Sequence, residues 1–386
     1  MVAPFMPDAE KVAAVRQALP ALSAGIYLAT GEVGPLPAET AAAMDEYAER
    51  ELRTGRGHPD DVEAGRERVD EARAGVAAVL ATDVDAITLT HGGSDALRRA
   101  IDTIDWRPGD RLLAVGRTEP ATAVARAAVA NRTGIVVDEM DPPDLADDEA
   151  TAEAVTVALT PSSRLVVVPH VTATGARLPV ERIAATAHER GALVAVDGAQ
   201  AVGAIGVVAD ESGADFYAIA GEKWLLGPDG IGALWIGPGQ GRRDAGPIEF
   251  HKPSVVGFAR SCGWLSMYVG LPWIHERGGA LTRWTADRLA AIDGVELLTP
   301  RTQTATLLAF RISGWPAEAA MAELGSRVFA IAGLIRSADA IRVGVGFFST
   351  EDELERFARA VELLAGHTPA TLPPKPRLAI LGQDLV

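Results

Sequence analysis

One stretch of the chain reads Leu-Val-Ala-Val-Asp-Gly-Ala-Gln, from Leu193 to Gln200. Its first four residues are apolar and lack the polar alternation of a half-exposed strand, which indicates a strand buried on both faces of a parallel sheet. That strand ends at Asp197. Because the ligands of open parallel sheets lie beyond the carboxyl ends of the strands, Asp197 is a candidate functional residue.

The same pattern continues on both sides of this stretch. Short apolar runs predict six further strands, at 86–89, 111–115, 134–138, 164–168, 215–219 and 231–236. Amphipathic segments separate several of them, such as the helix predicted from Val180 to Arg190. Strands that alternate with helices predict an α/β fold, in which a mostly parallel sheet of seven strands is sandwiched between helices.

The pattern changes after the Gly- and Arg-rich stretch 237–243, which predicts a loop or a domain junction. A smaller α+β domain is expected beyond it, with helices at 271–292 and 351–364 and strands at 307–312 and 340–345. The predicted organisation has four parts: an N-terminal segment 1–24 packing near the small domain, a large domain 25–250, a small C-terminal domain 251–366 and a Pro-rich tail 367–386.

Composition narrows the classes of function. The chain of 386 residues holds 36 Lys and Arg against 52 Asp and Glu, a formal net charge of −16. An acidic chain repels phosphate backbones and anionic lipids, so neither nucleic acid nor a membrane surface is an expected partner. Any anionic ligand must be held by a local site that works against this field.

Redox and targeting features predict a cytoplasmic protein. Cys262 is the single cysteine, so the chain forms neither an internal disulfide nor a zinc cluster. The first 24 residues lack the apolar core of a signal peptide. The apolar stretch 191–209 contains Asp197 and several glycines, which predicts a buried strand and turn rather than a membrane span.

A single lysine, Lys223, follows the strand predicted at 215–219, 26 residues after Asp197. This pair suits pyridoxal 5′-phosphate, since a lysine binds the cofactor aldehyde as a Schiff base and an aspartate keeps the pyridine nitrogen protonated. The alternatives are a surface lysine in a loop and an aspartate that caps a helix. Trp224 and Gly227-Pro228 argue against a solvated loop around Lys223.

The chain resembles the class V aminotransferase family of fold-type I pyridoxal-phosphate enzymes. Within that family it is most similar to the branch of isopenicillin-N-epimerase-like, cysteine-desulfurase-like and C–S-lyase-like proteins. The resemblance extends from Gly25 to about Leu364 and is carried by the segments Tyr-Leu-Ala-Thr-Gly-Glu-Val-Gly-Pro-Leu-Pro at 27–37, 194–200, 220–232 and Ile-Arg-Val-Gly-Val-Gly-Phe-Phe-Ser-Thr-Glu-Asp at 341–352. It implies a homodimer with its active sites at the dimer interface.

The resemblance also implies roles for further residues. Gln200 matches a family residue near the phenolic oxygen of the cofactor, and Arg342 matches the arginine that binds the α-carboxylate of the substrate. Gly93 and Ser94 open a helix after a strand, where backbone N–H groups and a hydroxyl can hold the cofactor phosphate. An ordinary capped helix, a capping glutamine and a surface arginine are the structural alternatives.

Several positions depart from the family pattern. Ala220 and Glu222 stand where many relatives carry a Ser and a His that touch the phosphate. A Glu222 carboxylate would repel a phosphate, so its side chain is expected to point elsewhere. The aromatic residue that relatives stack on the cofactor ring falls at Glu119 or Pro120, and neither side chain stacks.

Cys262 is the one candidate for a sulfur carrier. It lies 39 residues after Lys223, whereas the catalytic cysteines of the family lie far later, in a loop of the small domain. Ser261-Cys262 instead matches a Gly-Thr pair that reaches across the dimer in relatives. We therefore expect a buried cysteine rather than a persulfide carrier.

The expected function is C–S bond cleavage by β-elimination on a cysteine-derived α-amino acid, in a biosynthetic pathway. Transamination, epimerisation and decarboxylating oxidative deamination remain open, because the family performs all of them from the same cofactor. The departures at Ala220, Glu222 and Glu119 leave a second alternative, a catalytically silent partner subunit.

Overall fold

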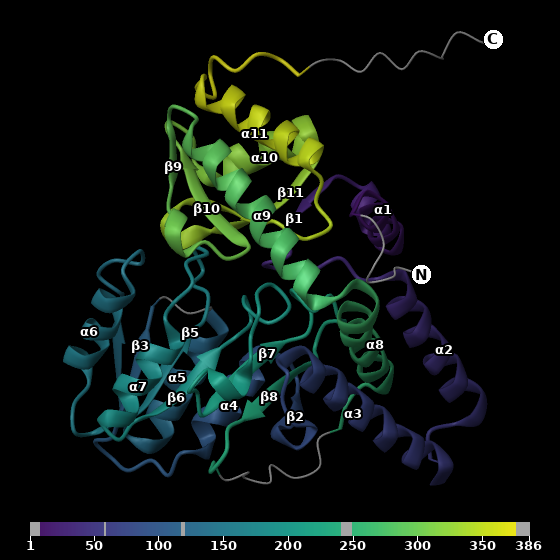
Figure 1. The fold of residues 1–386 in the computed structure, drawn as a ribbon, viewed down its shortest axis with the longest axis vertical. Coiled ribbons are helices and arrows are strands. Elements are labelled where there is room, and N and C mark those ends of the chain that lie inside the picture. Colours follow the sequence, from purple (N-terminus) through teal and green to yellow (C-terminus); the bar gives the residue numbers. More distant parts are fainter. Residues whose placement is uncertain (1–7, 58, 117–119, 241–248, 376–386) are drawn as a thin grey trace.

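The computed structural model describes residues 8–57, 59–116, 120–240 and 249–375 of the 386-residue chain (Figure 1). Two sheets organise it. The larger has seven strands in the order β2-β8-β7-β6-β5-β3-β4. Their bounds are β2 Ile87–Thr90, β3 Arg111–Val115, β4 Val136–Met140, β5 Ser163–Pro169, β6 Leu193–Asp197, β7 Phe216–Ala220 and β8 Gly232–Ile236.

The larger sheet is mostly parallel, as the sequence predicts. Strands β3 to β7 pair in parallel, and only β8 runs antiparallel, to β7 on one side and to β2 on the other. Every second residue of its central strands enters one of two apolar cores: Val166 and Val168 of β5 face one core, whereas Leu165 and Val167 face the other. Burial on both faces therefore explains the uninterrupted apolar runs.

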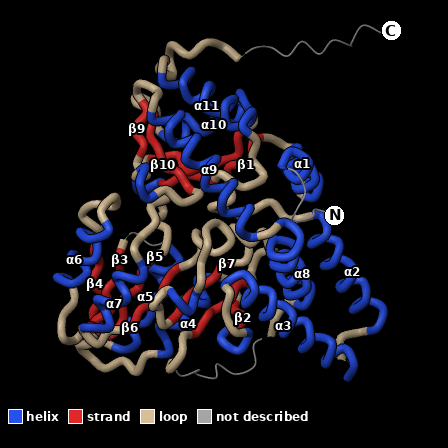
Figure 2. Tube along the Cα trace, viewed as in Figure 1, coloured by secondary structure: helices blue, strands red, loops and turns tan. Residues whose placement is uncertain are grey.

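Helices cover both faces of this sheet (Figure 2). They are α2 Ala38–Thr54, α3 Pro59–Leu80, α4 Gly93–Thr103, α5 Pro120–Thr133, α6 Asp148–Ala158, α7 Val180–Glu189 and α8 Lys252–Gly263. Helix α4 packs on β7 and β8, and α8 packs on α2 and α3. The side chains of α8 join the large core through Phe258 and Cys262. Thus α8, which was predicted with the small domain, packs with the large one.

The smaller sheet has five strands in the order β1-β11-β12-β10-β9. Their bounds are β1 Ile26–Leu28, β9 Val295–Leu297, β10 Leu307–Ile312, β11 Ala330–Ile335 and β12 Ala340–Gly344. Helices α9 Leu271–Ala290, α10 Ala317–Val328 and α11 Glu351–Ala365 pack with it around a second core. The sequence predicted no strand at 26–28 and placed this segment in the large domain, but β1 pairs in parallel with β11 at the edge of the smaller sheet.

The N-terminal helix α1, Asp8–Ala18, connects the two parts of the molecule. Its Val15 lies in the large core, and Arg16 forms an ion pair with Glu353 of α11. No helix among the described residues is both long and apolar enough to span a bilayer. In the same residues, no cluster of three or more His, Cys, Asp or Glu side chains is placed to bind a metal ion.

Candidate active site

The candidate residues gather at the carboxyl-terminal edge of the larger sheet. Asp197 is the last residue of β6 and lies beside Ala218 of β7. The last residue of β7, Ala220, pairs with Gly232 of β8, which in turn pairs with Thr90 at the end of β2. Topology thus brings Asp197, the Lys223 turn and the start of α4 to one edge, as the sequence predicts.

The turn that carries Lys223 is fixed by the loop that follows β1. The N–H of Gly34 donates to the carbonyl oxygen of Glu222 at 2.7 Å. A Cβ atom at Gly34 would lie 2.2 Å from the carbonyl oxygen of Lys223, so only glycine allows this approach. Lys223 itself is partly buried. The lysine is therefore held by backbone contacts to a segment almost 200 residues away in sequence, from Gly34 to Lys223.

Asp197 lies near a buried polar pair, His170 and Tyr217. Its Oδ1 accepts the N–H of Ala199 at 3.0 Å. Next to it, a Cβ atom at Gly198 would lie 2.0 Å from the Tyr217 ring, so glycine is required for this packing. The Tyr217 hydroxyl lies 2.5 Å from Nδ1 of His170. The pair was not predicted from the sequence, because two isolated polar residues, His170 directly after β5 and Tyr217 within β7, give no motif.

Burial keeps both members of this pair neutral. It lowers the pKa of His170 to about 3, and the charge of Arg177 acts in the same direction. Burial raises the pKa of the Tyr217 hydroxyl well above its ordinary value, with a further contribution from the negative charge of Asp197. The side chains of His170 and Tyr217 near Asp197 are thus polar but uncharged.

The nitrogen and the oxygen of the Gln200 side-chain amide each form a hydrogen bond within the protein. Its Nε2 donates to the carbonyl oxygen of Gly31 at 2.7 Å, and its Oε1 accepts the indole N–H of Trp224 at 3.0 Å. These contacts join the loop after β1 to the residue that follows Lys223. The capping role that was considered for Gln200 is not what the structure shows.

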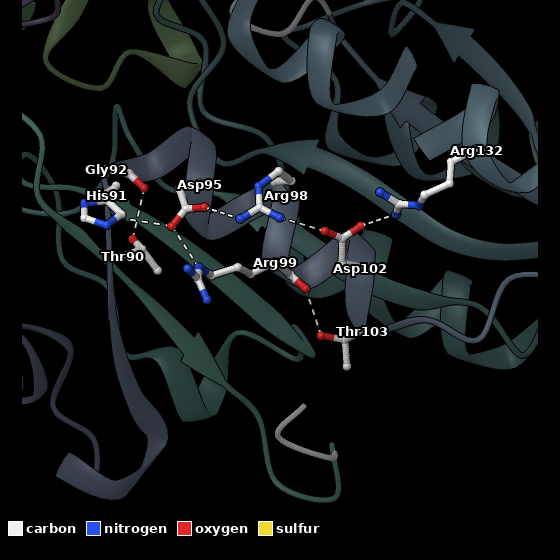
Figure 3. A network of polar contacts seen from close by, with 9 residues as sticks. All are labelled: Thr90, His91, Gly92, Asp95, Arg98, Arg99, Asp102, Thr103 and Arg132. Atoms are coloured by element: carbon white, nitrogen blue, oxygen red, sulfur yellow. Dashed lines mark hydrogen bonds and ion pairs between the residues drawn. The ribbon is translucent and has the colours of Figure 1, made fainter. Parts of the chain in front are cut away.

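Helix α4 begins at the same edge, and Figure 3 shows the polar contacts of its first turns. Gly92, at φ +95°, has no side chain to cap the helix. The Asp95 carboxylate, in the first turn, instead accepts the N–H of His91, the residue before Gly92, at 3.1 Å and so holds the chain that enters the helix. Although partial burial opposes ionisation, hydrogen bonds from Arg99 and Arg98 hold the pKa of Asp95 below its ordinary value.

The predicted phosphate residues lie in this first turn. Gly93 is the first residue of α4, and a Cβ atom there would lie 3.3 Å from Cβ of Ala220. Ser94 is exposed. The N-terminus of α4 and the end of β7, which precedes Lys223, are therefore in close contact through Gly93 and Ala220.

Glu222 does not present a free carboxylate to this edge. Its Oε2 is buried and has no hydrogen-bond partner among the described residues. Burial raises the pKa of Glu222 above its ordinary value, although Lys223 opposes the shift. Burial in a low-dielectric environment favours the neutral form of a carboxyl group. That Glu222 points away from the cofactor phosphate stays a prediction.

Arg342 lies on β12 and faces a pocket of about 690 Å³ between the two sheets. Its Nε donates to Oε1 of Glu32 at 3.0 Å, and its Nη2 donates to the same oxygen. Glu32 was not predicted as a site residue. Glu32 stands in the segment 27–37, but 310 positions separate it from Arg342. The sequence around either residue therefore does not indicate the contact.

Three other predictions have different outcomes. Cys262 is fully buried, and burial raises the pKa of its thiol to about 12. Ser261 hydrogen-bonds within its own chain, to Thr40 at 2.9 Å and to the carbonyl oxygen of Leu226 at 2.9 Å. Glu119 and the side chain of Pro120 lie outside the described residues, so the position of the stacking aromatic stays untested.

Comparisons with known proteins agree with this geometry. The profile of the family described as aminotransferase class-V matches residues 26–357. A probable cysteine desulfurase from Methanothermobacter thermautotrophicus is 24% identical, over 91% of this chain and 98% of the relative. An isopenicillin N epimerase from Amycolatopsis lactamdurans is 29% identical, over 61% of this chain and 69% of that protein.

Among solved structures, a similar one is the cystine C–S lyase C-DES in complex with its reaction product, cysteine persulfide. It aligns with a TM-score of 0.81 and 20% identity, covering 89% of this chain and 99% of that one. At this identity the likeness concerns the fold alone.

Proposed function

The chain belongs to the class V aminotransferase family, and on that premise we propose that it is a pyridoxal-5′-phosphate-dependent C–S lyase. The proposed substrate is an S-substituted cysteine. The net reaction consumes one water and converts the substrate into a thiol, pyruvate and ammonium. The names of the relatives, cysteine desulfurase and C–S lyase, support this chemistry.

The residues at the sheet edge fit the cofactor. A lysine and an aspartate follow adjacent strands β7 and β6, which suits an aldehyde and a pyridine nitrogen. The start of α4 offers backbone N–H groups to a phosphate. Burial raises the pKa of the Glu222 carboxyl group, which favours the neutral form that would not repel an anion. When bound, the cofactor withdraws electrons from Cα of the amino acid and thereby acidifies its Cα–H bond.

Each residue then has a stated task. Asp197 holds a proton on the pyridine nitrogen of the cofactor, above the neutral Tyr217 pair. Nζ of Lys223 accepts the proton from Cα, which allows the thiolate to leave from Cβ. Arg342 fixes the α-carboxylate and so orients the Cα–H bond. These assignments are proposals that site variants test.

The fate of the sulfur rests on one observation, the burial of Cys262. A protein-bound persulfide needs a thiolate that reaches the substrate. Cys262 is the single cysteine of the chain, its side chain is 0% exposed, and the pKa of its thiol is raised to about 12. We therefore infer that the sulfur leaves as a free thiol or persulfide and not on this protein.

Incubation of the purified protein with S-substituted cysteines tests the proposal. We expect a visible absorption band near about 420 nm that is lost on borohydride treatment, followed by thiol and pyruvate in equal amounts. Exchange of Cα–H without pyruvate would indicate epimerisation, and formation of a new amino acid from a 2-oxo acid would indicate transamination. Absence of the band after addition of the cofactor would indicate a silent subunit.

Two further points belong to the proposal. Cys262→Ala is expected to keep wild-type turnover, and a hundredfold loss, about 2.7 kcal/mol of barrier, would restore a sulfur-carrier role.

The family forms its active sites at a dimer interface, so we propose a homodimer. Sedimentation equilibrium tests this, with an expected mass about twice the 40.3 kDa of the chain.

A further inference from the structure

The pocket around Arg342 presents an anion to its ligand. Glu32 Oε1 accepts hydrogen bonds from both Nε and Nη2 of Arg342. The Arg342 side chain is 6% exposed, whereas the Glu32 side chain is 43% exposed, and both line the pocket. The buried member of the pair is therefore the cation, and the member that a ligand meets first is the carboxylate.

The fold builds this contact from three adjacent strands. Glu32 follows β1, Arg342 lies on β12, and Gly333 of β11 stands between them, opposite Arg342 in the sheet. A Cβ atom at Gly333 would lie 2.2 Å from Oε1 of Glu32. The turn that carries Glu32 is fixed as well, because its N–H donates to the carbonyl oxygen of Ala29 at 2.7 Å. A glycine thus leaves the space that the carboxylate fills.

Charge balance then distinguishes between substrates. The proposed function brings the α-carboxylate of the substrate to Arg342. Two carboxylates then compete for one guanidinium, whether the substrate joins Glu32 there or displaces it into the pocket. Either arrangement adds a negative charge to a molecule whose formal net charge is already −16. A cation on the substrate compensates that charge, whereas a second anion adds to the repulsion.

Among the described residues, the other charged side chains that line the pocket are Arg336 and Asp141. Arg336 lies at its edge, but the guanidinium is 76% exposed and lies 3.6 Å from the Glu318 carboxylate. Its charge is therefore paired and screened by water. Asp141 adds another carboxylate to the lining.

We propose that Glu32 is a specificity-determining residue, which selects cysteines whose sulfur substituent ends in a cationic group over those whose substituent ends in an anionic group. This inference rests on the proposed function for the identity of the substrate. The selection itself rests on the Glu32–Arg342 contact.

Three matched compounds test the selection by charge: S-(2-aminoethyl)cysteine, S-propylcysteine and S-carboxymethylcysteine. For the wild-type enzyme with its cofactor, we expect kcat/KM to fall in that order, with about a thirtyfold ratio between the first and the last. Glu32→Gln keeps an acceptor for Arg342 but removes the charge. It is expected to lower that ratio about tenfold, which corresponds to 1.4 kcal/mol.

Glu296→Gln is the matched control, because it removes the same charge from an exposed residue of the smaller sheet, paired with Arg311. It should leave the ratio unchanged. An equal loss for all three compounds in Glu32→Gln would mean that Glu32 only positions Arg342, and would overturn the proposal. Wild-type preference for S-carboxymethylcysteine would overturn it as well.

A binding measurement separates this proposal from the proposed function. The corresponding 3-thiopropionates lack the α-amino group and cannot react at the cofactor, so calorimetry measures their binding to the holoenzyme alone. We expect the same order of affinities, and Glu32→Gln should remove it. If the cysteines are not cleaved but this order is found, C–S cleavage is wrong and the role of Glu32 stands. If the three analogues bind equally to the wild type, the role of Glu32 is wrong.

Discussion

Asp197 is the residue at which the proposed chemistry is most directly tested. Asp197→Ala removes the carboxylate that would hold a proton on the cofactor, while its backbone contacts within β6 remain. We expect kcat/KM to fall at least about a hundredfold, or 2.7 kcal/mol, with little change in the free energy of unfolding. Steady-state kinetics and urea unfolding on the same preparation measure both, and turnover near that of the wild type would remove Asp197 from this role.

His170 predicts how stability depends on pH. The pKa of its imidazole is lowered to about 3 in the folded protein, from an ordinary value of 6.5. The unfolded chain therefore binds the proton more readily, and the folded state loses stability as the pH falls below 6.5. Between about pH 7 and pH 5 this residue alone accounts for about 2 kcal/mol of that loss.

His170→Gln tests this assignment, because it keeps a polar partner for the Tyr217 hydroxyl but has no titratable group. Urea unfolding at the two pH values should show a smaller decrease for the variant than for the wild type. His275→Gln is a suitable comparison, since burial also lowers the pKa of His275, to about 4. This variant should likewise lose less stability between the two pH values than the wild type does. An identical decrease in wild type and His170→Gln would contradict the prediction.

Among the elements, the start of α4 is held by one side chain of its own first turn, Asp95. Asp95→Ala removes the acceptor of the His91 N–H and the partner of two arginines. We expect a loss of about 1–2 kcal/mol in the free energy of unfolding. Asp102→Ala is the control, because it removes a carboxylate of the same helix that pairs with Arg98 and Arg132 (Figure 3). Its removal should cost less than about 1 kcal/mol.

The same scale shows what the sequence could predict. Strands β3, β6 and β10 begin and end where their apolar runs predict, because burial on both faces leaves a continuous signal. The strand predicted at 134–138 is displaced, since β4 begins at Val136 at the edge of the sheet and is only partly buried. An edge strand packs on fewer neighbours, so its apolar pattern defines its ends less clearly.

Contacts between distant segments could not be predicted in this way. The segment at 26–28 is too short to indicate a sheet, and its partner β11 lies some 300 residues later. The Glu32–Arg342 pair and the His170–Tyr217 pair are likewise formed only by the tertiary fold. The family resemblance reaches Lys223, Asp197, Gln200 and Arg342 because they stand in motifs. It gave no role to Glu32, which stands in the segment 27–37, and it does not extend to His170 or Tyr217, which stand in no such segment.

At the scale of the whole molecule, the net charge of −16 should govern how fast ligands arrive. Pyridoxal 5′-phosphate is an anion, so the protein field slows its approach, and salt screens that field. We expect its association rate constant with the apoenzyme to rise about threefold when ionic strength increases from about 0.01 to 0.15 M.

Pyridoxal, which lacks the phosphate, is the control for this measurement. Its association rate, followed by stopped-flow absorbance, should change little with salt. A rate constant for the phosphorylated compound that falls with salt would mean that the cationic groups near the site outweigh the overall charge, contrary to the prediction.

The pairing of β1 with β11 has a consequence for how the chain reaches its structure. Ile26 leaves the ribosome before its neighbour Ala330, which is about 300 residues further on. At about 5–20 residues per second, synthesis of that interval takes about 15–60 s. The apolar segment at 26–28 must remain without its strand partner for that time. A nascent chain that stalls before Ala330 therefore exposes an unpaired strand, which is a target for chaperones and for aggregation.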